Sequence, residues 1–258
     1  MHGGTRSRLA AATYQEEATP PEPVRVLAVV GSEGASSLLP STLAAASFAV
    51  TVPEDVDEAV TLARRLNPHV VLIDLRVTGA AGFGLCRQLR TFSVAYIVML
   101  GGRDDVDRRV GLSVGIDEYI DRLSNWTDVV ARLQAMLSRP VATTPGDRPP
   151  AQVLDDLTID LASRTVCVGD RLVSLTPTEF DLLATLVSHP TRVVERDELL
   201  QLVWGTAWVG EDHLIDVHMS NLRRKLGDDP RQPKYIQTVR GVGYRITVPP
   251  AQGQACSC

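Results

Sequence analysis

The chain has 258 residues, of which 44% are hydrophobic and 22% are charged, which is enough for two soluble domains with cores of ordinary size. Its net charge of -5 and isoelectric point near 5.6 exclude a surface that is basic overall. Any nucleic-acid binding must therefore depend on local clusters of arginine and lysine. The sequence contains no run that suggests a membrane span, and we expect a cytoplasmic protein.

The two ends of the chain are predicted to be disordered. Residues 1–23 are rich in Ala, Thr, Glu and Pro and have no continuous apolar core of the kind a signal peptide needs. A partner-binding tail and a misassigned start site remain open alternatives. Residues 250–258 contain Cys256 and Cys258, but two thiols without a nearby histidine make a weak metal ligand set, so we predict no metal site. With Cys86 and Cys167 they show no disulfide framework, which fits a reducing cytosol.

Residues 24–139 alternate between short apolar runs and helical segments. This pattern predicts an α/β domain, a doubly wound five-stranded parallel sheet with functional groups at the carboxyl ends of the strands. The expected strands are VRVLAVV from Val24, residues 49–52, VVLID ending at Asp74, YIVML from Tyr96 and EYI from Glu118. The expected helices lie near residues 36–46, 83–91, 105–114 and 127–137.

The stretch PHVVLIDLRVTGAAGFGLCRQLR, which contains the central strand, resembles a response-regulator receiver around its phosphorylated aspartate. The resemblance implies a flavodoxin-like receiver domain over residues 24–139, with Asp74 at the phosphoacceptor position. Receivers of this kind hold a divalent cation with two acidic residues at the end of the first strand and the acceptor itself.

Several positions around Asp74 depart from that pattern. Gly31 and Ser32 stand where the two acids are typical, and only Glu33 is acidic there. Gly101 replaces the hydroxyl residue that meets the phosphoryl group, and Arg122 replaces the usual lysine, keeping the charge but not the compact ammonium group. We therefore predict a degenerate, atypical receiver in which Asp74 is not used as a phosphoacceptor and no cofactor is bound.

The resemblance also implies a two-fold dimer face made by the fourth and fifth helices of the receiver, which would place two DNA-binding domains on neighbouring half-sites. Surface ion pairs contribute little individually, so adjoining apolar contacts would be needed for a homodimer. The charged residues expected on this face are Asp107, Arg108, Asp128, Arg132 and Arg139.

Residues 140–152 read as a linker, because PVATTPGDRPP holds four prolines and one glycine and has no apolar periodicity. A second domain is expected over residues 153–249. The runs LTID, RTVCV and RLVSL predict a small antiparallel sheet with Gly169 and Asp170 in its turn. Thr176 and Glu179 form a capping box around Pro177, which opens a helix to Ser188, and a short helix follows over residues 197–203.

The stretch DHLIDVHMSNLRRKL, residues 212–226, predicts an amphipathic helix. Ile215, Met219, Leu222 and Leu226 share one face, and the opposite face presents imidazole, hydroxyl, amide and guanidinium groups that suit phosphates and base edges. The run YIQTVRGVGYRITV then predicts a β-hairpin whose reversal is permitted by Gly241 and Gly243 and has Arg240 at its tip.

Three helices followed by a hairpin make a winged helix-turn-helix, and these segments resemble the DNA-binding domain of the OmpR/PhoB response regulators over nearly its whole length. The resemblance implies that helix 212–226 lies in the major groove, that Arg240 reaches the minor groove, and that Trp204 and His218 approach phosphates. Asn221, which stands where an arginine is frequent, suits adenine. The residues expected to contact DNA are Trp204, His213, Val217, His218, Ser220, Asn221, Arg223, Arg224, Thr238 and Arg240.

The sequence thus predicts a sequence-specific DNA-binding transcription regulator, not an enzyme, that works independently of phosphorylation and uses its receiver for dimerisation. Its partners would be double-stranded DNA, a second copy of the chain and, from the family resemblance, RNA polymerase. Two alternatives remain open. A small molecule or protein could bind the receiver cleft and adjust DNA binding, or the chain could be a conventional regulator activated through Asp74.

Overall fold

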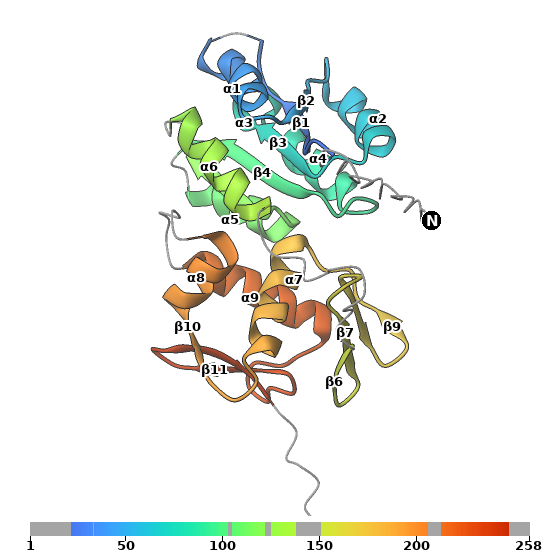
Figure 1. Cartoon of the computed structure of the whole chain (residues 1–258), viewed down its shortest axis with the longest axis vertical. Coiled ribbons are helices and arrows are strands. Elements are labelled where there is room, and N and C mark those ends of the chain that lie inside the picture. Colours follow the sequence, from blue (N-terminus) through green and yellow to red (C-terminus); the bar gives the residue numbers. More distant parts are fainter. Residues whose placement is uncertain are drawn as a thin grey trace, which may run out of the picture.

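The computed structural model describes residues 22–32, 34–102, 105–121, 125–137, 151–205 and 213–247. These residues form an N-terminal α/β domain and a C-terminal domain that lies directly against it (Figure 1). The predictions for both chain ends, for residues 140–150 and for Glu33, Arg122 and Arg139 fall outside the described residues.

The N-terminal domain is built on a five-stranded parallel sheet of order β2-β1-β3-β4-β5, so the predicted fold class is confirmed. The three inner strands are nearly continuous apolar runs, because helices cover both faces of the sheet. The strands are β1 (Arg25–Val29), β2 (Ala49–Thr51), β3 (Val70–Asp74), β4 (Tyr96–Gly101) and β5 (Glu118–Asp121). The helical segments are η1 (Gly34–Leu38), α1 (Leu39–Ala45), α2 (Val56–Leu66), α3 (Leu75–Thr78), α4 (Ala81–Leu89), α5 (Asp105–Val114) and α6 (Trp126–Leu137).

Helix α2 is an element that the sequence analysis does not assign. Its start is encoded locally, because the Asp55 side chain accepts a hydrogen bond from the backbone N–H of Glu58. Ala59, Leu62 and Ala63 form its buried face, and Asn67 ends it in a left-handed conformation with φ of 43°. Its apolar residues recur at helical spacing, so the sequence does carry a signal for this helix.

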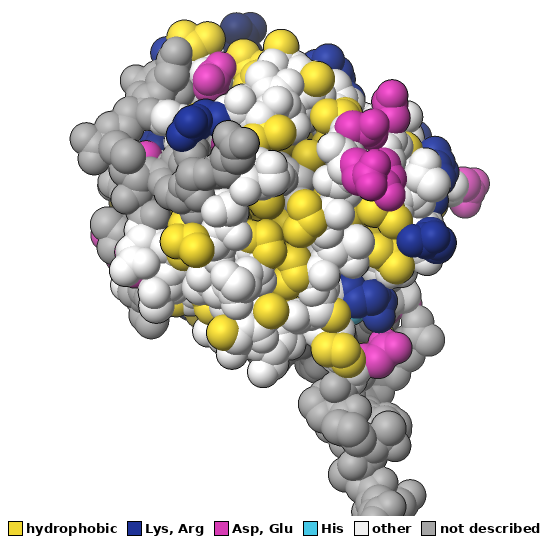
Figure 2. All heavy atoms as spheres, turned by 90° about the horizontal axis from the view of Figure 1, so that it is seen from above, with side chains coloured by type: hydrophobic (Ala, Val, Ile, Leu, Met, Phe, Trp, Pro, Cys, Tyr) yellow, Lys and Arg dark blue, Asp and Glu magenta, His cyan; other side chains and the backbone are white. Residues whose placement is uncertain are grey.

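Viewed from the side of the N-terminal domain, the molecule shows hydrophobic side chains in a central patch, with acidic side chains gathered beside it and basic ones spread around the rim (Figure 2). Such a surface is unsuited to a polyanion. No helix in the described segments is both long enough and apolar enough to cross a membrane.

The C-terminal domain begins with a four-stranded antiparallel sheet in the order β6-β7-β8-β9. Its strands are β6 (Gln152–Leu154), β7 (Leu157–Asp160), β8 (Thr165–Val168) and β9 (Arg171–Leu172), and β6 starts one residue before the predicted domain boundary. Helices α7 (Pro177–Ser188), α8 (Arg196–Trp204) and α9 (His213–Leu226) follow, with a second sheet of order β10-β12-β11. Its strands are β10 (Val194–Glu195), β11 (Ile236–Val239) and β12 (Gly243–Ile246), so the winged-helix prediction is confirmed.

Two local predictions in this domain are confirmed in detail. The capping box at the start of α7 forms in both directions between Thr176 and Glu179, with Pro177 in the first turn. In the hairpin, Gly241 has φ of 74°, as a tight reversal requires. A Cβ on Gly243 would lie 2.0 Å from the carbonyl oxygen of Val194, so this position must stay glycine for β10 to pair with β12.

The two domains share one hydrophobic cluster. It includes Leu112 and Ile116 of the N-terminal domain together with Met219 and Leu222 of α9. Helix α5 contacts α9, and helix α6 contacts α8. We call this contact region between the domains the seam.

Candidate nucleic-acid interface and receiver cleft

Helix α9 buries its apolar face in its own domain, as its periodicity predicts. Ile215, Met219, Leu222 and Leu226 are 2% exposed or less. The burial fixes the rotation of the helix, so Ser220 and Arg224 point away from the C-terminal core.

The predicted reading face is not open to solvent in this conformation. Trp204, His218, Asn221 and Arg223 are all buried, with exposed fractions of 2%, 1%, 8% and 8%. Asn221 donates from Nδ2 to the carbonyl oxygen of Leu112 on α5, 3.1 Å away. The sequence analysis expects an outward surface here, and the correction has two physical reasons: helix α5 of the N-terminal domain covers Asn221, and Arg223 points into its own domain against β11.

His218 lies at the centre of the covered region. Its ring packs against Trp204 with centroids 5.7 Å apart, and its Nε2 has no hydrogen-bond partner within the described part of the chain. Burial lowers the pKa of His218, although the nearby charges of Asp117 and Glu179 act to raise it. The imidazole is therefore held neutral between the domains.

Other predicted DNA contacts remain accessible. Ser220, Arg224 and Arg240 are exposed, whereas Val217 and Thr238 are half-buried. His213 begins α9, but its side chain is outside the described set. These positions leave only part of the predicted interface available while the seam is closed.

The local basic cluster is smaller than the sequence suggests. Arg223 donates from Nη2 to the carbonyl oxygen of Ile236 and to the hydroxyl of Thr238, both at 2.8 Å, and so supports the hairpin from inside. Lys225 pairs with Glu179 at 2.6 Å, and Lys234 pairs with Asp155 and Asp156. Acidic partners in the same domain offset these charges in the surface field that the sequence alone suggests.

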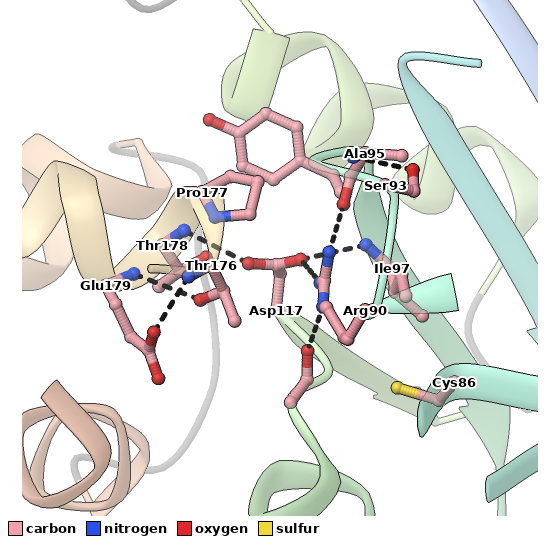
Figure 3. Close-up of polar contacts among 12 residues, drawn as sticks. Cys86, Arg90, Ser93, Ala95, Ile97, Asp117, Thr176, Pro177, Thr178 and Glu179 are labelled. Atoms are coloured by element: carbon pink, nitrogen blue, oxygen red, sulfur yellow. Dashed lines mark hydrogen bonds and ion pairs between the residues drawn. The ribbon is translucent and has the colours of Figure 1, made fainter. Parts of the chain in front are cut away.

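A buried carboxylate of the N-terminal domain joins the two domains. Asp117 is fully buried and follows the turn after α5. One of its oxygens pairs with Arg90 and accepts from the backbone N–H of Ile97 at 2.8 Å. The other accepts from the backbone N–H of Thr178 at 3.0 Å, in the first turn of α7 (Figure 3). Asp117 thus places negative charge at the N-terminus of a helix in the other domain.

Arg90 holds the carboxylate of Asp117 in place. Its Nε donates to the carbonyl oxygen of Gly115 at 2.7 Å, and its Nη1 donates to that of Ala95 at 2.6 Å. The guanidinium therefore has three acceptors, two of them in residues 115–117 and one at Ala95. The backbone N–H of Thr178 therefore donates to a carboxylate whose position is fixed within the N-terminal domain.

A second polar contact and a tight apolar contact complete the seam. Tyr96 donates its hydroxyl to Asp181 on α7 at 2.8 Å, and Arg164 pairs with the other oxygen of that carboxylate at 2.7 Å. On the opposite side, a Cβ built on Gly205 would lie 2.9 Å from the Cβ of Ala135 on α6. The domains meet there with no room for a larger side chain.

At the carboxyl edge of the parallel sheet, Asp74 is fully buried. Its Oδ2 accepts from the hydroxyl of Ser36 at 2.7 Å, and its Oδ1 accepts from the backbone N–H of Arg76 at 2.9 Å. Gly31 is half-buried and Ser32 is exposed at the end of the first strand. The described residues include no group of three or more His, Cys, Asp or Glu side chains placed to hold a metal ion.

The space beside Gly101 is filled from another strand. A Cβ at this position would lie 1.8 Å from the hydroxyl oxygen of Tyr119, which donates to the carbonyl of Gly102 at 3.0 Å. Glycine is therefore required by the inward position of the tyrosine. A hydroxyl residue at position 101 and Tyr119 in this conformation exclude each other.

The charged residues predicted for a dimer face lie on α5 and α6. Asp107, Arg108 and Arg132 are half-buried and Asp128 is exposed. Arg132 lies 4.0 Å from Glu118 within its own domain. These two helices are also the ones that contact α9 and α8, so part of the predicted dimer face is used inside the chain.

Sequence reasoning missed Ser36, Asp117, Arg90, Tyr96 and Tyr119. Each acts through a partner more than 15 residues away. Tyr119 alone left a signal, because Gly101, the glycine that stands in place of a hydroxyl residue, lies on the neighbouring strand β4. The others look like ordinary strand-end and loop residues until the two domains are placed together.

Comparisons with known proteins agree with both halves of this geometry. A family model described as "Response regulator receiver domain" matches residues 26–134, and one described as "Transcriptional regulatory protein, C terminal" matches residues 169–246. The DNA-binding response regulator MtrA of Mycobacterium tuberculosis is 38% identical over 228 residues, covering 87% of this chain and 97% of its own. The response regulator MprA of Mycolicibacterium vanbaalenii is 36% identical and covers 88% and 99%.

The chain also resembles a solved mutant of the protein RitR. Their structures agree with a TM-score of 0.68 at 26% identity, over 87% of this chain and 99% of the other. The match spans both domains.

Proposed function

Because the chain belongs to the OmpR/PhoB family of DNA-binding response regulators, we propose that it is a sequence-specific transcription regulator that reads DNA with α9 and the β11–β12 hairpin. The outward positions of Ser220, Arg224 and Arg240 support this use of the two elements. Asn221 would read a base edge and His218 and Trp204 would meet phosphates. RNA polymerase is the further partner that the family resemblance implies.

The covered reading face is the observation that carries the regulatory part of the proposal. Asn221 cannot bond a base edge and the carbonyl of Leu112 at once, and His218 and Trp204 have no exposed surface for phosphate. The conformation described above is therefore a closed, DNA-incompetent state. DNA binding requires the domains to separate at the seam, and any effector acts by its different affinity for closed and open states.

The same separation would free the receiver for self-association. Because α5 and α6 contact α9 and α8, the dimer predicted for Asp107, Arg108, Asp128 and Arg132 competes with the closed seam. Opening would then release both surfaces that binding to paired half-sites needs.

We assign the control of this opening to something other than phosphorylation of Asp74. The carboxylate is fully buried, its Oδ2 is occupied by Ser36, and Tyr119 fills the space beside Gly101. The competing candidate is a conventional phospho-activated regulator. Incubation with acetyl phosphate and magnesium, followed by intact-mass measurement, tests the two: we expect no stable adduct, and an adduct lost in Asp74→Asn would favour the conventional candidate.

The DNA-binding assignment is tested with an operator taken from a genome-wide map of bound DNA. In an anisotropy titration, Arg240→Ala should weaken binding to all sequences, because a minor-groove cation contributes without strict base preference. Asn221→Ala should relax preference at one base position by about 1–3 kcal/mol. Arg231→Ala, at an exposed site outside both elements, is the matched control. If both variants bind like this control, the groove assignment is wrong.

A further inference from the structure

A cavity of about 400 Å³ lies between the domains, on the side of α7 that faces the start of β4. The N-terminal domain contributes the 67–69 loop, Val94–Tyr96 and the end of α6, and the C-terminal domain contributes Arg164, residues 175–177 and Phe180. The cavity is distinct from the Asp74 cleft and from the reading face of α9. Its size falls in the range of small-molecule sites, which occur preferentially between domains.

The walls are mostly apolar. Val94, Met136, Leu175 and Phe180 line the space, and Val94 is 78% exposed although its neighbours Ala95 and Ser93 are buried. An exposed valine at the mouth of an apolar cavity is a surface that a ligand can cover with a gain in free energy.

Two hydrogen-bond donors belong to this lining. The Nδ1 of His69 accepts from the backbone N–H of Arg25 at 3.0 Å, which leaves the ring proton of a neutral imidazole on Nε2. Burial, followed by the charge of Arg25, lowers the pKa of His69 and so favours that neutral form. The Nε2 donor has no partner among the described residues.

Arg164 supplies the second donor and a positive charge. Its Nη2 donates to the carbonyl of Pro177 at 3.1 Å and to Asp181 at 2.7 Å, and its guanidinium carbon lies 4.3 Å from the centre of the Phe180 ring. The guanidinium also interacts with the hydroxyl group of Tyr96, so groups from both domains fix its position. A planar guanidinium has five N–H donors, so Arg164 can hold a carboxylate or sulfonate while it keeps these contacts.

We propose that this cavity binds a small amphiphilic organic anion, with an aromatic or aliphatic body against Val94, Leu175 and Phe180 and its acidic group on Arg164. Both domains build the walls, so the full set of contacts exists only in the closed state. The ligand would therefore hold the seam closed and lower the affinity for DNA. That consequence rests on the proposed function, whereas binding itself does not.

The test uses the full chain and two dyes of nearly the same shape, anilinonaphthalene sulfonate, which is an anion, and phenylnaphthylamine, which is neutral. We expect one dye per chain, seen as enhanced fluorescence. Arg164→Gln should weaken binding of the sulfonate roughly tenfold or more, as loss of a charge-assisted contact does, and leave the neutral dye unchanged. The matched control Arg171→Gln removes an exposed arginine outside the cavity.

Filling the cavity gives a second variant that does not depend on charge. Leu175→Phe should weaken both dyes, whereas Leu202→Phe, on the exposed side of α8, should weaken neither. The thermal unfolding midpoint of every variant shows whether it folds. The proposal is wrong if neither Arg164→Gln nor Leu175→Phe changes the affinity for the dyes. It is also wrong if the control variants lower that affinity by the same amount. So does binding that appears only after residues 1–21 are removed, since the chain itself would then fill the cavity.

The coupling to DNA is measured separately. Saturating sulfonate dye should reduce operator affinity of the wild type and leave that of Arg164→Gln unchanged. If the dye binds as expected and operator affinity stays constant, the site stands and the coupling fails. If the chain binds no operator at all, the dye titration still decides the site, and only the proposed function fails.

Discussion

The Asp74 cleft and the seam differ in where their polar groups find partners. At the cleft, Asp74 is bonded to Ser36 and Arg76 of its own domain. At the seam, Asp117 and Tyr96 of one domain bond Thr178 and Asp181 of the other. The hydrogen bonds of the cleft lie within one domain and do not depend on where the other domain is. The hydrogen bonds of the seam join two domains, so they break when the domains separate.

This difference indicates where regulation can act. A buried carboxylate that keeps its partners in both states cannot favour one of them, because only interactions that differ between states shift an equilibrium. The seam contacts exist in one state alone. We therefore expect large effects from changes at the seam and small effects from changes at Asp74.

The largest effect should come from a wedge at the tightest contact. Ala135→Leu places added methyl groups against Gly205, and overpacking of this kind costs about 1–3 kcal/mol in the closed state. The open state, where α6 is uncovered, bears little of that cost. We expect operator affinity to rise about fivefold to a hundredfold in an anisotropy titration.

Ala131→Leu is the matched control, because Ala131 is exposed one turn earlier on the same helix. It should leave affinity unchanged. If operator affinity increased equally in both variants, the cause would be the added hydrophobic surface of α6 and not a steric conflict with Gly205.

The pH dependence of closure should be the next largest effect. Burial lowers the pKa of His218 in the closed state, so the open state binds more protons as the pH falls through about 6.5. The contribution of neutral His218 to the closed state is therefore fully present above that pH and decreases as the pH falls below it. Each unit by which burial lowers the pKa of His218 can change the ratio of closed to open molecules by a factor of about ten at most.

Neighbouring charges also act on the pKa of His218. Asp117 and Glu179 raise its pKa and Arg90 lowers it, and burial outweighs the two acids. Small-angle scattering between about pH 7.5 and 5.5 should show a growing radius of gyration. His218→Gln should remove this change, and His189→Gln should retain it. A radius that is constant in the wild type would contradict the assignment.

A smaller effect is expected from one interdomain hydroxyl. Tyr96→Phe removes the hydrogen bond to Asp181, which is worth about 0.5–1.5 kcal/mol, and leaves the ring in place. Operator affinity should increase by about 2-fold to 10-fold. Tyr235→Phe, which removes a bond to Asp156 inside the C-terminal domain, should lower stability without that increase. Equal operator affinity in Tyr96→Phe and the wild type would show that this hydrogen bond does not stabilise the closed state.

The smallest effect should follow Asp74→Asn. The amide keeps the size of the side chain; its oxygen can accept from the backbone N–H of Arg76 and its NH2 group can donate to the hydroxyl oxygen of Ser36, so operator affinity should change by less than about twofold. Loss of DNA binding in Asp74→Asn, together with an unchanged affinity in Ala135→Leu, would favour a working phospho-switch.

Much of the fold was predictable because its signals are local. The apolar runs of the parallel strands, the Thr176–Glu179 capping box and the glycines of the hairpin each specify structure within a few residues. The identity of the reading helix followed from the same kind of signal. Its availability did not, because Asn221 is covered by α5, more than a hundred residues earlier in the chain.

The departures around Asp74 show the same limit. The sequence predicts that Gly101 lacks a hydroxyl, but it does not reveal that Tyr119 fills the vacant space. Nor does it reveal Asp117 as an interdomain residue, since a short acidic segment after a helix is usually a solvated surface. Contacts between domains depend on their relative placement, which no local pattern encodes.

The central claim, that the receiver covers the reading face of α9, is tested most directly by cutting the chain between its domains. A specific protease site placed within residues 140–150 allows operator affinity to be measured in one preparation before and after cleavage. A single half-site should be used, so that dimerisation does not contribute. We predict tighter binding after cleavage at nanomolar protein, and a return toward the uncut affinity when excess receiver fragment is added. Unchanged or weaker binding after cleavage would contradict the claim.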